Sequence, residues 1–342
     1  MPPIVPDEAR CLPFKVWGQT IGEKVMRAVV YDRYGSPDVL QVVDVPRPKP
    51  NAGQVRVRIA ATSVNRSDWE GLRGSPLYAR IGGLRAPAVR TLGSDIAGSV
   101  DAVGSGVTRF QPGDEVYGDN LALRGGFAEY AIAPDSALAH KPPGLTFAEA
   151  SSIPQAGAIA LQGTLGVSDG SRVLVNGGGG GSGSFAIQQA KRLGAHVTAV
   201  DNAGKLDHML SLGADEVVDY DRDDFTRAGP YDLILDLVAE RSAFAYRRAL
   251  ARGGRYRCVG GSVPVLLGVV ALGWIVGGFT DRRIGLLVVK EGPAHFEPLA
   301  ELCVAGEIRI RIDRTFELAE VPEALAHVGE GRALGKVVVE VR

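Results

Sequence analysis

The stretch from residue 171 to residue 201, SRVLVNGGGGGSGSFAIQQAKRLGAHVTAVD, constrains the fold more than any other part of the chain. The apolar run Arg172–Asn176 predicts a buried strand, and five consecutive glycines follow it. Apolar residues then recur at helical spacing over Ser184–Leu193, and His196–Val200 predicts a second strand. A strand, a turn, a helix and a second strand in this order form one unit of a parallel sheet with helices on its faces.

Three glycines of this turn, Gly178, Gly180 and Gly183, satisfy the pattern G-x-G-x-x-G between a strand and a helix. In that setting the first glycine allows the tight turn, the second lets the backbone approach a pyrophosphate, and the third lets the helix pack on the strand. Backbone amides at the helix start, including those of Gly181 and Ser182, then face the phosphates. A flexible linker is also rich in glycine, but it does not lie between two apolar strands and an amphipathic helix. The turn therefore predicts a dinucleotide-binding domain.

The acidic residue Asp201 closes the second strand, where a carboxylate accepts hydrogen bonds from the adenosine ribose of a dinucleotide. With Asn202 beside it, Asp201 favours NADH, because a carboxylate repels the 2′-phosphate of NADPH. Lys205, Tyr220 and Arg222 favour NADPH if their cationic and hydroxyl groups face that phosphate. Each of these three is also a common surface residue. The sequence therefore favours NADH and leaves NADPH open.

The overall composition excludes some partners and favours a reducing compartment. The chain has 342 residues, enough for two domains with separate cores, and a net charge of -1 with a pI near 6.5. No basic excess points to nucleic acid as a partner. The three cysteines, Cys11, Cys258 and Cys303, are too few and too far apart for a disulfide framework or a C-x-x-C metal site, so we expect a cytoplasmic protein. Residues 1–25 lack the apolar segment of a signal peptide, and we interpret them as an N-terminal extension.

The order of short strands and helices predicts an α/β protein of two domains, the first of them in two parts. Short β runs separated by Gly, Pro and Asp over residues 26–145 predict a compact, mostly antiparallel β domain. Residues 146–292 alternate strands with helices, which predicts a doubly wound parallel sheet, and Thr146 with Glu149 forms a capping box at the first helix. Residues 293–342 are expected to return to the β domain. The expected strands after the glycine turn are Glu216–Asp219, Tyr231–Leu237, Gly254–Val259, Ile308–Ile312 and Lys336–Val341, and the expected helices are Lys205–Leu212, Arg241–Ala251, Phe296–Val304 and Val321–Val328.

Six segments carry a family resemblance through their order and spacing. They are SVNRSDW at 63–69, GSDIAGSVDAVGSGVTRFQPGDEVYG at 93–118, GGFAEYAIAP at 125–134, the glycine turn, LGADEVVDY at 212–220 and IDRTFELAEVPEALAHVGEGRALGKVVVEV at 312–341. Together they resemble the medium-chain dehydrogenase/reductase superfamily, and in particular its zinc-free quinone oxidoreductase-like branch. The resemblance covers nearly the whole chain from Met26. It implies a GroES-like β domain interrupted by a Rossmann domain, commonly as a homodimer, with the active site in the cleft between the two.

The resemblance raises the question of whether the site holds a catalytic zinc ion. Zinc-dependent members resemble Cys-His-(Ser/Thr)-Asp where this chain has residues 65–68, and Gly-His-Glu where it has Gly93, Ser94 and Asp95. Zinc prefers thiolate, imidazole or carboxylate ligands in a tetrahedron, and Asp95 alone cannot hold it, so no catalytic zinc is expected. Hydrogen bonds then have to meet the negative charge that develops on the substrate oxygen. That suits conjugate reduction of an enone or a quinone, with the hydride supplied by nicotinamide.

The candidate catalytic side chains follow the third strand of the β domain. Asn65 is expected to donate to the substrate oxygen or to the nicotinamide ribose, or else to form an Asx turn that shapes the loop. Ser67 stands at the position of the relay hydroxyl in zinc-dependent members, where it passes a proton to the reduced substrate, or else caps a helix. Asp68 is a third candidate, although a carboxylate there more often anchors the fold through backbone amides. Glu70 stands where related quinone and enoyl reductases carry a tyrosine, which leaves the proton donor unassigned.

Candidate contacts to the nicotinamide come from two other places. Small residues in SSIPQAGAIALQG (151–163), Gly157 among them, let the ring lie at a helix start, where Gln155 or Gln162 binds its carboxamide. Close packing between domains explains the small residues but not the glutamines. Ligands also gather at the carboxyl ends of parallel strands. By that rule the nicotinamide half of the coenzyme contacts Val259, Gly260, Gly261, Leu286 and Leu287.

Residues 262–280, SVPVLLGVVALGWIVGGFT, carry no charge and approach the length of a membrane span. Their glycines, their proline and their place between two strands of the parallel sheet disfavour spanning. We expect this run to cover the substrate pocket or a dimer seam, where it selects small apolar carbonyl or quinone substrates. Peripheral membrane contact is a further hypothesis from the same run.

Three functions remain open from the sequence. The leading one is a zinc-independent NAD(P)H-dependent oxidoreductase that reduces quinones, enones or related activated carbonyls. The second is a zinc-free alcohol dehydrogenase or ketone reductase that uses Ser67 as a proton relay. The third is a cofactor-binding structural or regulatory protein without turnover, since folds of this kind are reused.

Overall fold

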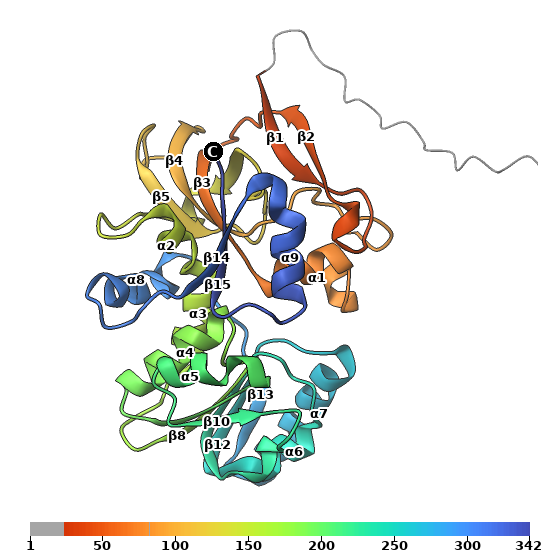
Figure 1. Ribbon diagram of the computed structural model, residues 1–342, viewed down its shortest axis with the longest axis vertical. Coiled ribbons are helices and arrows are strands. Elements are labelled where there is room, and N and C mark those ends of the chain that lie inside the picture. Colours follow the sequence, from red (N-terminus) through yellow and green to blue (C-terminus); the bar gives the residue numbers. More distant parts are fainter. Residues whose placement is uncertain (1–23, 82) are drawn as a thin grey trace, which may run out of the picture.

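The computed structural model describes residues 24–81 and 83–342 (Figure 1). Most of the predicted N-terminal extension, residues 1–23 with Cys11, lies outside the described residues. The chain forms two lobes, each built on its own sheet, and the segment after β13 returns from the second lobe to the first. This is the predicted α/β arrangement of a GroES-like domain and a Rossmann domain.

The lower lobe of Figure 1 contains a parallel sheet of six strands in the order β10-β9-β8-β11-β12-β13. Numbered within the sheet this is the order 3-2-1-4-5-6 of a dinucleotide-binding fold. The central strands are apolar because helices cover both of their faces. α4 (Gly181–Arg192) and α5 (Leu206–Ser211) pack on one face, and α6 (Ala243–Ala249) and α7 (Val263–Phe279) pack on the other. The strands are β8 (Arg172–Asn176), β9 (His196–Asp201), β10 (Glu216–Asp219), β11 (Tyr231–Asp236), β12 (Leu250–Cys258) and β13 (Arg283–Leu286).

The upper lobe contains a seven-stranded sheet and a separate two-stranded hairpin. The sheet path is β14-β15-β3-β4-β5-β7, and β6 pairs with β3 away from that path. Only β14 and β15 run parallel, so the sheet is mostly antiparallel as predicted. The hairpin is β1 (Val25–Val30) with β2 (Gln41–Pro46), and the sheet strands are β3 (Gln54–Val64), β4 (Asp95–Val103), β5 (Glu115–Asp119), β6 (Tyr130–Pro134), β7 (Leu138–His140), β14 (Ile312–Glu317) and β15 (Lys336–Glu340).

Five further helices lie in the β domain, at the junction of the two lobes and in the return segment. They are α1 (Arg66–Arg73), α2 (Phe147–Ser151), α3 (Pro154–Gly163), α8 (Glu297–Val304) and α9 (Val321–Gly329). The predicted capping box at α2 is confirmed, because the Glu149 amide donates to the Thr146 hydroxyl at 3.2 Å and the Thr146 amide donates to the Glu149 carboxylate at 2.9 Å. α3 starts next to β4 and β5 and packs along α4, so it connects the two lobes.

One predicted strand is wrong. The segment 308–311 pairs with no strand, and β14 begins only at Ile312. The side chain of Gln188 in α4 takes the place of a neighbouring strand, because it accepts from the Arg309 amide at 2.8 Å and donates to the Arg309 carbonyl at 3.0 Å. The buried side chain of Ile308 explains the apolar pattern that suggested a strand.

The uncharged run 262–280 forms α7, which follows β12 and precedes β13 in the sequence. This helix packs on one face of the parallel sheet. Within the described residues, no helix combines the length and the apolar character needed to cross a bilayer.

Candidate active site

The glycine turn joins β8 to α4 at the carboxyl end of the parallel sheet. Gly183 has no room for a side chain, because a Cβ atom there would overlap the Gly177 carbonyl oxygen and lie 2.6 Å from Cα of Gly178. Gly180 is the N-cap of α4, and Gly181 and Ser182 open the helix. The first amides of a twelve-residue helix have no partner within it, so they suit an anion. The turn has the shape and the polarity that a pyrophosphate requires.

The carboxylate of Asp201 lies beside this turn at the end of β9. Its Oδ2 atom accepts from the Gly179 amide at 3.0 Å, and its Oδ1 atom accepts from the Asn202 amide at 2.9 Å. The ammonium group of Lys205 lies 3.3 Å from Oδ1, with both side chains buried. The Tyr220 amide donates to the Asp201 carbonyl at 3.2 Å, and its side chain is exposed. Four residues predicted to contact the adenosine ribose therefore lie together at the glycine turn, whereas the side chain of Arg222 extends into solvent and is 81% exposed.

The residues predicted to contact the nicotinamide ribose lie at the same edge of the sheet. Val259, Gly260 and Gly261 directly follow β12, and the Gly260 carbonyl accepts from the Ala239 amide at 3.0 Å. Leu286 ends β13, and the amide of the next residue, Leu287, donates to the Cys258 carbonyl at 2.7 Å. Their place at the carboxyl ends of β12 and β13 is as expected, and their contact with coenzyme stays a prediction.

In the β domain, Asn65 is the N-cap of α1. The backbone N–H of Asn65 donates to Oδ2 of Asp68 at 2.9 Å, and Oδ1 of Asp68 accepts from the backbone N–H of Gly93 at 3.0 Å. Asp68 is fully buried, and burial raises the pKa of its carboxyl group. Because both carboxylate oxygens bind backbone amides, Asp68 fixes the start of α1 against the turn at Gly93.

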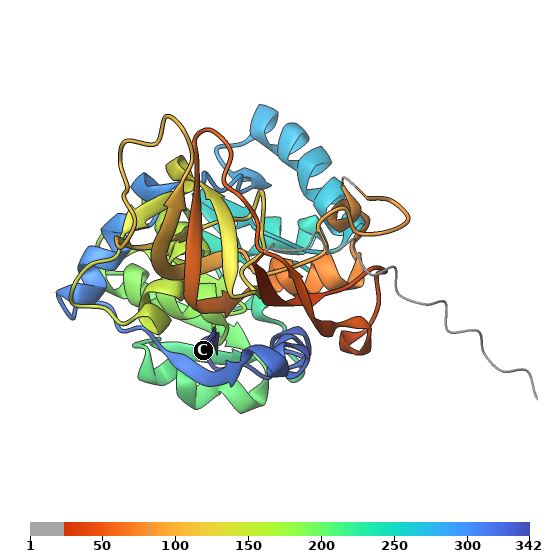
Figure 2. The same cartoon turned by 90° about the horizontal axis from the view of Figure 1, so that it is seen from above.

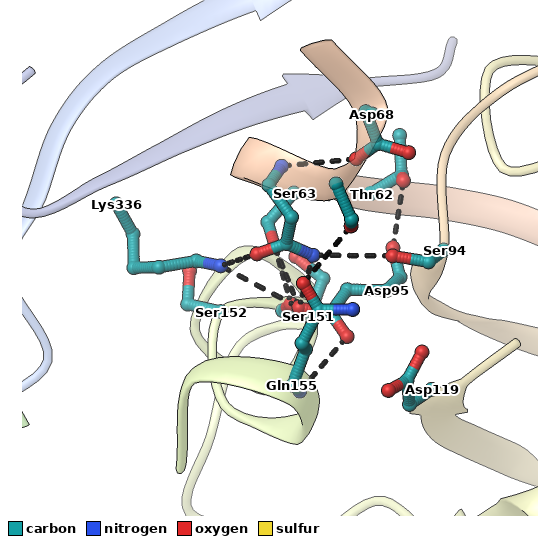
Figure 3. A network of polar contacts seen from close by, with 12 residues as sticks. Thr62, Ser63, Asp68, Ser94, Asp95, Asp119, Ser151, Ser152, Gln155 and Lys336 are labelled. Carbon is teal, nitrogen blue, oxygen red and sulfur yellow. Dashed lines mark hydrogen bonds and ion pairs between the residues drawn. The ribbon is translucent and has the colours of Figure 1, made fainter. Parts of the chain in front are cut away.

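The Asn65 side chain enters a buried polar cluster, here named the Asp95 cluster, which contains Ser63, Asn65, Ser94, Asp95 and Lys336 (Figure 3). The Asn65 Nδ2 atom donates to Asp95 Oδ2 at 2.9 Å and to Ser94 Oγ at 3.2 Å. The Lys336 Nζ atom donates to Asn65 Oδ1 at 2.8 Å and to Asp95 Oδ2 at 3.4 Å. Ser63 Oγ lies 3.2 Å from the same carboxylate oxygen. Both ends of the Asn65 side-chain amide are therefore hydrogen-bonded. Its oxygen accepts from the Lys336 ammonium group, and its nitrogen donates to the Asp95 carboxylate and to Ser94.

The electrostatics of the cluster involve a second buried carboxyl group. Burial raises the pKa of Asp95 and lowers the pKa of Lys336, and the attraction between the two opposes both shifts. Asp119 lies opposite Asp95 on β5, and burial together with the charge of Asp95 raises the pKa of Asp119 to about 8. The amide of Leu121 donates to Asp119 Oδ1 at 3.1 Å. One ammonium group therefore faces one carboxylate, and Asp119 carries a proton at neutral pH.

Ser67 and Gln155 connect α1 to α3 by a direct hydrogen bond. The Ser67 hydroxyl donates to Gln155 Oε1 at 3.0 Å. The backbone N–H of Gln155 donates to Asp95 Oδ1 at 3.0 Å. Gln162 uses both ends of its side chain on the backbone of Lys290, each at 2.9 Å. Of the two glutamines proposed for the nicotinamide carboxamide, Gln155 is the one at the Asp95 cluster.

The structure also shows what two further residues, Gly157 and Glu70, contact. A Cβ atom on Gly157 would lie 2.7 Å from Cδ2 of Leu299, so this glycine allows α3 to approach α8 closely. Glu70 accepts a hydrogen bond from the Tyr78 hydroxyl at 3.1 Å, and the same hydroxyl lies next to the backbone of Gly261. A tyrosine hydroxyl therefore lies beside Glu70, although it comes from another place in the sequence. Burial and Glu70 raise the pKa of Tyr78 to about 12.

Sequence reasoning assigned no role in the site to six residues of this region, Ser63, Tyr78, Ser94, Asp95, Asp119 and Lys336. Lys336 gave one local signal, since it opens a strand whose next three residues are buried valines. A lysine at the start of a strand is otherwise common, and its partners lie more than two hundred positions away.

A GroES-like domain and a Rossmann domain that meet at a glycine turn and a buried polar cluster define a dinucleotide-dependent oxidoreductase. Residues 51–143 match the family model described as alcohol dehydrogenase GroES-like domain, and residues 212–339 match the model described as zinc-binding dehydrogenase. The chain belongs to the medium-chain dehydrogenase/reductase superfamily, in its quinone oxidoreductase-like branch.

Three similar proteins illustrate the match. The NAD(P)H oxidoreductase RTN4IP1, mitochondrial, of Mus musculus is 33% identical, over 93% of this chain and 89% of the relative. The 2-methylene-furan-3-one reductase of Solanum lycopersicum is 34% identical, over 92% of this chain and 79% of the relative. The solved quinone oxidoreductase from Coxiella burnetii has a TM-score of 0.84 and 30% identity, over 93% of this chain and 100% of that one. The chain is an oxidoreductase of this family.

The side chains of the Asp95 cluster do not fit zinc. The ammonium group of Lys336 donates to Asn65 and Asp95, so a cation already occupies the place between the positions that carry ligands in zinc-dependent members. A second cation there would meet a positive charge and an amide whose oxygen is engaged. In residues 24–81 and 83–342, no group of three or more His, Cys, Asp or Glu side chains is arranged to hold a metal ion.

Proposed function

We propose that the protein is a zinc-independent, NAD(P)H-dependent reductase of quinones, enones and related activated carbonyls. One observation carries the proposal: the strand start that touches the glycine turn also delivers the cation of the Asp95 cluster. The Gly335 amide donates to the Gly179 carbonyl at 3.0 Å, and the next residue, Lys336, donates to Asn65 at 2.8 Å. Two consecutive residues, Gly335 and Lys336, therefore join the glycine turn to the Asp95 cluster.

The coenzyme, when bound, supplies the hydride at nicotinamide C4. The amides of Gly181 and Ser182 face its pyrophosphate, and Asp201 accepts from its ribose hydroxyls. We propose NADH as the preferred form, because the Asp201 carboxylate at the end of β9 repels a 2′-phosphate, and Lys205, which lies beside it, is paired with that carboxylate.

Of the chain's own polar groups, the Ser67 hydroxyl is the one we expect to act on the substrate oxygen, because the side chains of Asn65 and Lys336 are buried and paired. Lys336 brings a positive charge to the cluster and, through Oδ1 of Asn65, orients that amide. The Ser67 hydroxyl is half-buried at the junction of α1 and α3, where it can reach a substrate in the cleft. Hydrogen bonds of this kind stabilise charge that spreads over a conjugated system, which favours quinones and enones over simple ketones. A homodimer and a cytoplasmic location stay predictions from the sequence.

The decisive experiment is a titration with NADH and NADPH in parallel, followed by turnover with quinones, enones and simple ketones. We expect tighter binding of NADH and reduction of the conjugated acceptors only. Asp201→Ala is expected to remove the preference for NADH, whereas Asp221→Ala, at an exposed acid beyond β10, is the matched control and leaves it unchanged. A strong preference for NADPH in the parent protein contradicts the coenzyme assignment, and turnover of simple ketones alone contradicts the substrate class.

A further inference from the structure

The solvent-facing side of α7 is an apolar stripe, named here the α7 stripe. The seventeen residues of the helix carry no charge. One side, with Val269, Leu272 and Val276, is buried against the parallel sheet. The other side exposes large side chains: Leu267 at 66%, Val270 at 53%, Trp274 at 85%, Ile275 at 51% and Phe279 at 88%. A helix that is apolar all round is normally covered all round, and none of the residues 24–81 and 83–342 covers this side.

Exposed apolar side chains continue on both sides of the cleft. Phe244 of α6, which packs beside α7, is 70% exposed. Across the cleft, the loop after α1 exposes Leu77, Ile81 and Leu84 at 70%, 86% and 77%. This loop meets the start of α7, because the Tyr78 hydroxyl lies next to the Gly261 backbone. Figure 2 shows α7 at the margin of the molecule near the orange loop.

The apolar surface is bordered by positive charge. Residues 240–283 contain eight arginines and two acidic residues, in a chain whose net charge is -1. Arg282 donates to the carbonyls of Leu250 and Ala251 at 3.2 and 3.1 Å, which brings the start of β13 beside the start of β12 at the C-terminal end of α7. The exposed arginines of this corner are Arg248, Arg252 and Arg283, and none of them forms an ion pair with the described residues.

We propose that the α7 stripe docks on an anionic phospholipid membrane, with the helix lying in the plane of the interface. Exposed Trp and Phe side chains enter the boundary of the acyl chains, and arginines at the end of the helix meet the lipid phosphates. The proposal rests on the proposed function, since a membrane-dissolved quinone then reaches the cleft at the start of α7 without crossing water. A second copy of the chain is a poorer cover, because it would bring the same uncharged stripe and the same arginines, which offers these arginines no acidic partner.

The test is co-sedimentation of the full chain with vesicles, without turnover. We expect binding to vesicles of phosphatidylcholine mixed with phosphatidylglycerol, weak binding to phosphatidylcholine alone, and a blue shift of the Trp274 emission. The double variant Trp274→Gln/Phe279→Ser loses binding. Arg248→Glu and Arg283→Glu each weaken it by roughly fivefold or more. Leu210→Ser, on α5 at the opposite face of the sheet, is the matched control and binds like the parent protein.

Three outcomes would overturn the proposal. They are no binding to the mixed vesicles, binding that the double variant retains, and a dimer that the double variant dissociates in the absence of any vesicle binding. The last result assigns the stripe to a second copy. Reduction of a short-chain, water-soluble quinone by the parent protein is measured separately. If the parent protein binds vesicles but reduces no quinone, the proposed function fails and the membrane surface stands.

Discussion

The charge of Lys336 lies in a place that solvent barely reaches, with 3% of its side chain exposed beside the fully buried Asp95. We expect Lys336→Met to lower the free energy of unfolding by about 3–5 kcal/mol, because it leaves the Asp95 carboxylate buried and unpaired. Chemical denaturation measures the change. The double variant Lys336→Met/Asp95→Asn removes both charges and is expected to recover part of the loss. A double variant no more stable than the single one would argue against the pairing.

A second prediction at this scale concerns Asp119 and pH. Its pKa is raised to about 8 in the folded chain, against about 3.9 in the unfolded chain. Between these values the folded chain holds a proton that the unfolded chain has released. The stability that this proton contributes is therefore complete at acidic pH and is lost as the pH rises toward 8.

Asp119→Asn keeps this side chain neutral at every pH. The free energy of unfolding of the parent protein is expected to fall relative to that of the variant as the pH rises from about 5 to about 8, by at most about 1.4 kcal/mol per pH unit. Urea denaturation of both proteins across this range measures the difference. Parallel stability curves would be incompatible with a protonated Asp119.

At the scale of elements, the junction of β8 and α4 depends on the absence of a side chain at Gly183. Gly183→Ala places a methyl group on the Gly177 carbonyl oxygen, so the helix start has to move away from the strand. We expect NADH binding, measured by fluorescence titration, to weaken by about tenfold, which equals about 1.4 kcal/mol. Gly268→Ala is the control within a helix, since a Cβ atom there meets nothing within 4 Å. Equal affinity in the two variants would show that the close approach at Gly183 is unimportant.

The elements also show what the sequence could and could not predict. The parallel sheet was predictable because β8 and β9 are apolar runs next to a glycine turn, and these are local signals. The strand expected at Ile308–Ile312 was wrong because Gln188, more than a hundred residues earlier, satisfies that backbone. Lys336 was missed for the same reason, since its partners are the N-cap of α1 and the first residue of β4. Periodicity reports burial along the chain and does not report which distant group provides the hydrogen bonds.

At the scale of the whole molecule, two backbone contacts hold the return segment against the Rossmann domain. Gln188 binds the Arg309 backbone at both its amide and its carbonyl, and Gly335 binds the Gly179 carbonyl. The family resemblance predicted that the chain returns to the first domain. No motif predicted the place where the return segment crosses the glycine turn, because glycine, glutamine and arginine at these positions are also common surface residues.

These contacts make the alignment of the two domains depend on one side chain far from the cleft. Gln188→Ala removes two hydrogen bonds to the crossing segment, and we expect it to lower the free energy of unfolding by about 1–3 kcal/mol. Because the segment leads to Gly335 at the glycine turn, the variant is also expected to raise the KM for NADH more than it lowers kcat. Gln188→Glu keeps the acceptor for the Arg309 amide and loses the donor, so an intermediate effect is expected. If stability falls while the KM for NADH stays at the parent value, the crossing segment supports the fold without positioning the coenzyme loop.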